Sequence, residues 1–367
     1  MRYKQKSGSI LPKEKASQLH TRNMRYSWTI WTKAVLNTRT ALRARSHGIR
    51  KLEKQNPDDD KMNNMNKQVE KLQNKLCREF GDWVDGKTQR KLFWDGPKKS
   101  YEACLAGDEN ELYTVGTETD HLLTWHFSGY ANAVLNEDRY PLDEFALCAR
   151  YAKAAVQFEA AFADAGQNGS ILLHQAAFNF SLNILSGWRT DANTIGHLLV
   201  KGLDTSLLDL KHNDRHEKGK LYRHFWFLLH LYCSAKGLIL DTSLYSYPED
   251  MSPYDKVLAD WRTPDVDTVQ SFVTAMADFH LREARETEHD EIAEFDDYGY
   301  MLFPHEILSF LRVREWLGLP NPCTFDHPLM NQPLARMPQP VPLPQPDTPL
   351  LDQVIGKFKR EYPGSFA

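Results

Sequence analysis

Two Glu-x-x-His pairs are the residues whose types and spacing come closest to a known chemistry. Glu118 and His121 are three residues apart, as are Glu286 and His289, so each pair places a carboxylate and an imidazole on one helix face. Di-iron helical bundles use two such pairs with two further glutamates. Chance alone gives about one such pair in a chain of this composition, and these two lie 168 residues apart. Solvent-facing helix positions are the simpler interpretation, and a metal-dependent enzyme is the alternative.

The other sequences that could carry catalysis are incomplete. Phe303-Pro304-His305-Glu306 begins like the helix of a zinc protease, but the second histidine that such a helix needs is missing. Neither a Gly-x-Ser-x-Gly nucleophile elbow nor a Gly-x-x-x-x-Gly-Lys phosphate loop occurs. The sequence therefore predicts a protein that is not an enzyme, with no catalytic residue, no metal ligand and no cofactor.

A dense run of acidic residues is a stronger signal. Between Asp278 and Asp297, nine carboxylates face only Arg282 and Arg285. Like charges crowded on a helix and its following loop are destabilising, so a basic partner surface is the simplest reason to keep them. Two neighbouring tyrosines are the kind of aromatic anchor that is common at protein interfaces. We predict that a partner protein binds these residues: Glu286, Glu288, Asp290, Glu291, Glu294, Asp296, Asp297, Tyr298 and Tyr300.

Charge is also divided along the whole chain. Residues 1–100 contain 24 Lys/Arg and 10 Asp/Glu, which gives a net charge of +14. Residues 101–367 contain 21 Lys/Arg and 39 Asp/Glu, which gives −18, so that the whole chain has a net charge of −4. The acidic part attracts a basic partner and repels nucleic acid. The basic part has two open interpretations. It binds nucleic acid through the arginines and lysines of residues 39–54, or it docks on the acidic part of its own chain.

Helices are expected to position these residues. Proline opens segments, mostly with acid in the first turn, at Pro141, Pro253, Pro264, Pro304 and Pro349. Apolar residues recur at helical spacing over 265–285, and the segment 221–236 is apolar on most faces, which predicts a central buried helix. The fold class predicted is all-α: a multi-helix bundle or stacked antiparallel helix pairs.

Three segments are expected along the chain. Residues 1–97 form a basic N-terminal helical hairpin, with helices over 24–52 and 62–80, and residues 98–319 form the main helical body. Residues 320–367 are a proline-rich strap and a terminal helix over 349–362. Ten of the thirty residues 320–349 are proline, which favours an extended strap across the body. A polyproline ligand for an aromatic groove is the alternative.

The composition predicts a soluble cytoplasmic protein. Charged residues and histidines interrupt the apolar stretch 221–240, which favours a buried helix over a membrane span, and the polar N-terminus lacks the apolar core of a secretion signal. The five cysteines are scattered and never in Cys-x-x-Cys spacing, which argues against a disulfide framework or a zinc site.

The C-terminal part of the chain resembles a known protein family. Its motifs are Trp261-Arg262-Thr263-Pro264, Phe279-His280, Asp296-Asp297-Tyr298, Leu302-Phe303-Pro304-His305-Glu306 and Asp326-His327-Pro328-Leu329-Met330. Over roughly residues 110–335 the chain is similar to the all-helical immunity proteins of bacterial polymorphic-toxin and type VI secretion effector systems.

The resemblance implies the function of an antitoxin, which binds and neutralises a cognate toxin by protein–protein interaction. If that toxin is a nuclease with a basic cleft, the acidic residues would stand in for phosphate and speed the encounter. A nucleic-acid-binding helical protein is an alternative from another class, and the metal-dependent enzyme is a third. The sequence predicts no oligomeric state.

Overall fold

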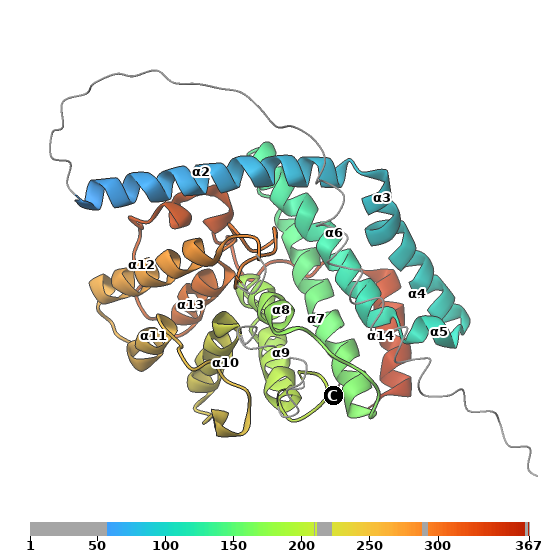
Figure 1. The fold of residues 1–367 in the computed structure, drawn as a ribbon. Helices are drawn as coiled ribbons and strands as arrows, with labels where there is room; N and C mark the ends of the chain where they lie inside the picture. Colours follow the sequence, from blue (N-terminus) through green and yellow to red (C-terminus); the bar gives the residue numbers. More distant parts are fainter. Residues whose placement is uncertain (1–56, 209, 211–221, 288–292, 364–365, 367) are drawn as a thin grey trace, which may run out of the picture. The chain divides into compact units, whose positions relative to one another are not determined.

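Helices make up all the regular structure in the described residues of the computed structural model, which are 57–208, 210, 222–287, 293–363 and 366. No strand occurs in these residues, which confirms the all-α prediction. The helices, drawn in Figure 1, are α2 (Pro57–Val84), α3 (Lys87–Arg90), α4 (Gly96–Ala106), α5 (Glu109–Leu112), α6 (Val115–Asn136), α7 (Leu142–Asp164), α8 (Leu173–Leu185), α9 (Arg189–Gly202), α10 (Arg223–Lys236), α11 (Tyr254–Asp260), α12 (Val266–Glu283), α13 (His305–Trp316) and α14 (Pro349–Glu361).

Short segments of other helix types complete the set. A π-helical segment, η2 (Lys91–Asp95), joins α3 to α4. Three 3₁₀ turns follow: η3 (Thr242–Leu244), η4 (Pro328–Asn331) and η5 (Pro333–Ala335). The predicted helix over 62–80 is observed as part of the longer α2. The predicted helix over 24–52, and with it the first half of the expected hairpin, lies outside the described residues.

Proline stands at the start of five helices, as the sequence predicts. Pro141, Pro253 and Pro304 directly precede the first residue of α7, α11 and α13, and Pro349 is the first residue of α14. The fifth proline precedes Asp265, whose carboxylate caps α12 by accepting hydrogen bonds from two backbone N–H groups of the first turn. A helix tolerates proline at these positions because the first N–H groups have no partner within the helix.

The centre of the fold is built on α6, α7 and α8. The five residues 137–141 join α6 to α7, and the two helices pack along each other (Figure 1). Alanines such as Ala146, Ala149 and Ala152 are fully or almost fully buried on α7, and such small side chains let neighbouring helix axes approach closely. The helix α8 packs against both α7 and α13.

The predicted central helix is observed as α10. It contacts α8, α9, α11 and α13, and every side chain from Phe225 to Leu229 is buried. Gly237 ends it with φ +69°, a left-handed conformation that glycine adopts without strain.

The proline-rich segment is a strap packed on the helical body, as predicted. The Trp188 side-chain Nε1–H donates to the Leu343 carbonyl (2.7 Å), and the Leu343 N–H donates to the Ser186 carbonyl (2.9 Å). Gly187 permits this approach, because a Cβ at that position would lie 2.8 Å from Val341 Cβ. The strap leads into α14, whose Phe358 ring lies 4.5 Å from that of Phe158 on α7.

The described residues, which begin at Pro57, form one compact unit. The expected segments 98–319 and 320–367 therefore share a core with α2, which packs along α6. The five cysteines are free thiols, and only Cys323 is exposed. Among the described helices we find no candidate for a membrane span, because none combines the required length with sufficient hydropathy.

Candidate protein-interaction site

The predicted partner-binding residues follow α12, in the loop that leads from Glu283 to α13. Three of them, Glu288, Asp290 and Glu291, lie outside the described residues. The structure places the remaining six in three different surroundings: the core, the boundary of the core, and the surface against α2. The loop is therefore not a single outward-facing acidic surface.

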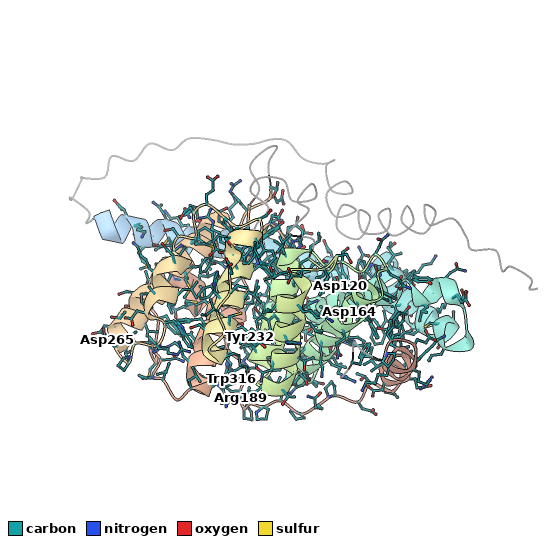
Figure 2. The ribbon with its side chains drawn as sticks, turned by 90° about the horizontal axis from the view of Figure 1, so that it is seen from below. Asp120, Asp164, Arg189, Tyr232, Asp265 and Trp316 are labelled. Atoms are coloured by element: carbon teal, nitrogen blue, oxygen red, sulfur yellow. The ribbon has the colours of Figure 1, made fainter. Side chains whose placement is uncertain are left out.

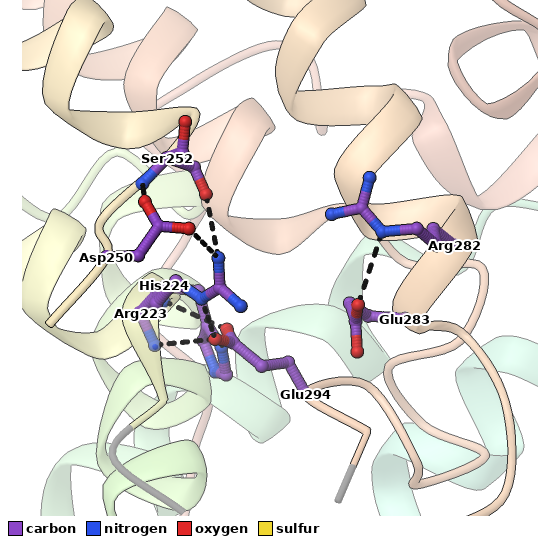
Figure 3. A network of polar contacts seen from close by, with 7 residues as sticks. All are labelled: Arg223, His224, Asp250, Ser252, Arg282, Glu283 and Glu294. Atoms are coloured by element: carbon purple, nitrogen blue, oxygen red, sulfur yellow. Dashed lines mark hydrogen bonds and ion pairs between the residues drawn. The ribbon is translucent and has the colours of Figure 1, made fainter. Parts of the chain in front are cut away.

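Glu294 faces the core, which corrects its predicted place on the surface. Its carboxylate lies at the start of α10 and accepts hydrogen bonds from the backbone N–H of Arg223 (2.9 Å) and of His224 (3.3 Å). The Arg223 Nε (3.2 Å) and the His224 Nδ1 (3.0 Å) contact the same carboxylate (Figure 3). A carboxylate is stabilised at a helix N-terminus because the free N–H groups point at it. Through these hydrogen bonds Glu294 fixes the loop to the N-terminus of α10.

Arg223 also connects Glu294 to the segment before α11. Its Nη1 donates to the Ser252 carbonyl (3.0 Å) and lies 3.3 Å from the Asp250 carboxylate (Figure 3). The Ser252 N–H donates to the other Asp250 oxygen at 2.8 Å. Arg282 and Glu283, at the end of α12, form a separate ion pair of 3.4 Å in the same view.

Tyr300 is also buried rather than exposed, which corrects its role as a surface anchor. Its ring packs against Phe178 (4.8 Å between centroids), and its carbonyl oxygen lies 3.0 Å from His280 Nε2. The other nitrogen of His280 lies 2.8 Å from Glu306 Oε1, and neither of these two side chains has any solvent exposure. His280 thus has an oxygen atom opposite each of its ring nitrogens, which fixes the orientation of the ring.

A third buried histidine completes this histidine cluster of His224, His280 and His305. The His224 and His305 rings are 5.4 Å apart, and the Phe295 ring stacks on His280 at 3.8 Å. His305 Nδ1 lies 3.0 Å from the Ser181 hydroxyl. Burial, with the neighbouring histidines, lowers the pKa of His305 well below its ordinary value, so its ring is neutral.

Asp297 lies at the boundary of the core. Its carboxylate accepts a hydrogen bond from the Gly299 N–H (2.7 Å), but burial raises its pKa to about 7, with a further contribution from Asp296. Asp297 therefore carries only part of a negative charge at neutral pH. Asp296 is half-buried and accepts a hydrogen bond from the Thr287 hydroxyl (2.6 Å).

Glu286 and Tyr298 lie at the surface against α2. Lys75 of α2 forms an ion pair with Glu286, and its Nζ lies 4.7 Å above the Tyr298 ring. Further along α2, Lys61 pairs with Asp278 at 2.9 Å. Two lysines of α2 therefore contact acids of the later part of the chain, and both interpretations of the basic part stay predictions. The arginines and lysines of residues 39–54 lie outside the described residues.

Of the two Glu-x-x-His pairs, only the first lies wholly within the described residues. Glu118 and His121 contact each other at 3.2 Å on α6, and His289 of the second pair lies outside the described residues. Within the part of the chain that the structure describes, no group of three or more histidine, cysteine, aspartate or glutamate side chains has an arrangement suited to a metal ion.

An exposed acidic surface does exist, one that the sequence prediction missed. It lies on α11, on the first turn of α12 and just before α11, and we call it the acidic edge. Its members are Glu249, Asp255, Asp260, Asp265 and Asp267, all exposed. None of them forms an ion pair with another described residue, and the same stretch holds two cations, Lys256 and Arg262. The sequence signal that could have identified the acidic edge is the presence of acidic residues in the helical turns that follow Pro253 and Pro264.

The acidic edge is carried by well-packed helices. Tyr254 and Val257 of α11 and Val269 and Val273 of α12 are buried, so the opposite faces of these helices carry the acid. Figure 1 shows α11 and α12 adjacent, and Figure 2 shows Asp265 far from the other labelled acids, Asp120 and Asp164.

Comparison with known proteins adds no further assignment: no family model, no curated protein and no solved structure matches the chain.

Proposed function

We propose that this chain is a non-enzymatic, all-helical protein that binds and neutralises a basic protein toxin of a bacterial polymorphic-toxin or type VI secretion system. The family resemblance suggested this function, and one structural observation supports it best. The acidic edge presents five exposed carboxylates against two cations, without ion pairs to the described part of its own chain. Such a field attracts a basic partner and accelerates its encounter.

The acidic edge replaces the loop 286–300 as the principal recognition surface in this proposal. Glu294 and Tyr300 are buried, so these two residues are not available for a partner, and the exposed Glu286 is paired with Lys75. The buried part of the loop instead contacts α10 through Glu294, and α12 and α13 through Tyr300.

Co-expression tests the proposed function directly. The chain is produced together with the product of the adjacent reading frame in a bacterial host. The expected result is that the neighbour alone stops growth, that the chain restores growth, and that the two proteins co-purify. A harmless neighbour, or rescue without a complex, contradicts the proposal.

Charge reversal tests the surface. We expect the triple variant Asp255→Lys, Asp260→Lys, Asp267→Lys to slow association with the toxin at least about tenfold at low salt, because steering by charge is lost. Surface plasmon resonance at several salt concentrations measures this rate. The matched control reverses three exposed acids on α2, directly after α2 and on α4: Asp82→Lys, Asp85→Lys and Glu102→Lys. Equal slowing in both triple variants would show that only net charge matters.

A further inference from the structure

A cleft lies between α2 and the two 3₁₀ turns η4 and η5. Its volume is about 430 Å³, within the range of sites that bind ligands. One wall is a face of α2 that includes Met62, Asn66, Glu70 and Gln73. The other wall comes from the start of the strap and includes Asp326. We call this the α2 cleft.

The α2 wall is a straight stripe along the helix. Its four residues are spaced by four, four and three positions, which keeps them on one face. With a rise of 1.5 Å per residue, the stripe is roughly 16 Å long. An extended chain advances about 3.3 Å per residue, so the cleft accommodates about five residues of an extended peptide.

The polar groups of the cleft are free to bind a ligand. The side chains of Asn66 and Gln73 form no hydrogen bond with another described residue, and Glu70 and Asp326 form no ion pair with one. Carboxamides both donate and accept hydrogen bonds, as the peptide group does. The two carboxylates attract a positive charge, and none of the described residues that line the cleft is a lysine, arginine or histidine.

The rest of the cleft is apolar or already held in place. Val69 and Pro328 are buried beneath the polar side chains. Gln332 donates to the carbonyl oxygens of Leu302 (2.6 Å) and Leu329 (3.1 Å), so it fixes the strap wall instead of pointing at a ligand. The cleft therefore combines an apolar floor, two free amides and two free carboxylates on a rigid frame.

We propose that the α2 cleft binds an extended peptide segment of the partner protein that carries lysine or arginine. This assignment rests on the proposed function, since it names the part of the partner that enters the cleft. The amides hydrogen-bond the peptide backbone, and Glu70 and Asp326 bind the cationic side chains. The roughly 16 Å length and the paired amides favour a peptide over a small cation, which would use the carboxylates alone.

Fluorescence polarisation with the purified full chain tests the cleft. The probe is a fluorescein-labelled pentapeptide, Gly-Lys-Gly-Lys-Gly, and the reference is the same peptide with glutamate in place of lysine. We expect the lysine peptide alone to bind. We expect Glu70→Gln with Asp326→Asn to weaken its binding at least about tenfold, the size typical for loss of charge-assisted contacts.

Two further variants separate recognition from simple attraction. Asn66→Ala with Gln73→Ala removes no charge and is expected to weaken binding at least about threefold, because two amide contacts are lost. Asp82→Asn with Asp85→Asn removes two exposed acids of the same region outside the cleft and is expected to change binding less than about twofold. Circular dichroism confirms that each variant is folded.

Several outcomes overturn the assignment. These are no binding of the lysine peptide, equal loss in the Asp82/Asp85 control, or full binding by the Asn66/Gln73 variant together with complete displacement by spermidine. Rescue of growth in the co-expression experiment without peptide binding would remove the cleft assignment and leave the proposed function standing. Peptide binding without rescue of growth would remove the proposed function and leave the cleft as a site for basic peptides.

Discussion

Glu159 is a carboxyl group buried between helices. Its Oε2 accepts a hydrogen bond from the Ser170 N–H at 2.9 Å, and a Cβ at Gly116 would lie only 1.9 Å from its Oε1. Burial raises its pKa to about 8, in part opposed by the Ser170 hydrogen bond and reinforced by the nearby Asp120. The folded protein therefore holds a proton on this group at neutral pH, whereas the unfolded chain does not.

The raised pKa predicts how Glu159→Gln affects stability. With a pKa higher in the folded state, the contribution of Glu159 is fully present below pH 4.5 and is lost as the pH rises through about 8. We expect the variant to gain on the order of 3 kcal/mol over the native protein at pH 9 and to match it at pH 5. Urea unfolding at both pH values measures this. The exposed Glu102→Gln serves as the control, and an equal gain there would contradict the explanation.

Gly169 is required by close backbone packing near the same residue. A Cβ there would lie 2.0 Å from the Glu159 carbonyl oxygen and 2.6 Å from the Ala163 nitrogen, and backbone atoms inside a helix cannot move aside. We expect Gly169→Ala to destabilise the protein by about 3 kcal/mol. Gly129 in α6 is the matched control, because nothing lies within 4 Å of its added Cβ. Gly129→Ala should stabilise by up to about 1 kcal/mol through helix propensity. Chemical denaturation compares the two, and equal effects would refute the packing argument.

At the scale of elements, α2 is held to the body mainly by its apolar face. Val69, Leu76 and Phe80 are buried at helical spacing, while the ion pairs of Lys61 and Lys75 lie at the surface. Exposed ion pairs contribute little because water screens them. The charges therefore favour this position of α2, and the apolar face supplies most of the stability.

Two neighbouring substitutions in α2 test whether its apolar face contributes more stability than its ion pairs. We expect Leu76→Ala to cost about 3 kcal/mol, because it leaves a cavity in the core. Lys75→Ala, one residue earlier, should cost less than about 1 kcal/mol, and this small cost should shrink further in 0.5 M salt. Thermal and urea unfolding of both variants give the comparison. A larger cost for Lys75→Ala than for Leu76→Ala would show that charge holds the helix.

At the scale of the molecule, the buried ionisable groups make opposite contributions to the pH dependence of stability. His305 has a lowered pKa, so its contribution to stability is present above pH 6.5 and is lost on acidification. Asp120, Asp297 and Glu159 have pKa values raised to about 6, 7 and 8, so their contributions are lost as the pH rises. Above about pH 4.5 the three carboxyl groups outweigh the single histidine.

These groups together predict that thermal stability falls as the pH rises from about 5 to about 8. Differential scanning calorimetry between pH 4 and pH 9 at constant ionic strength measures it. A melting temperature that keeps rising up to pH 8 would mean that the buried carboxyl groups do not retain their protons.

Local features of the sequence predicted most of the helical fold. Proline and acid at helix starts, glycine at helix ends and apolar spacing identified α7, α10, α11, α12, α13 and α14, because these signals act within one helical turn. The alternating prolines predicted the strap for the same reason, since a chain that lacks N–H groups cannot form helix or sheet.

The sequence by itself determined the helix-forming segments, the strap and the charge of each segment. The tertiary structure alone decided which acids face solvent. Glu294 meets Arg223 71 positions away in the sequence, and Glu286 meets Lys75 211 positions away. Such pairing depends on how helices far apart in the sequence pack together. Glu294, from the acidic run of the sequence, therefore lies buried at the start of α10, whereas the more scattered acids of α11 and α12 form the exposed acidic edge.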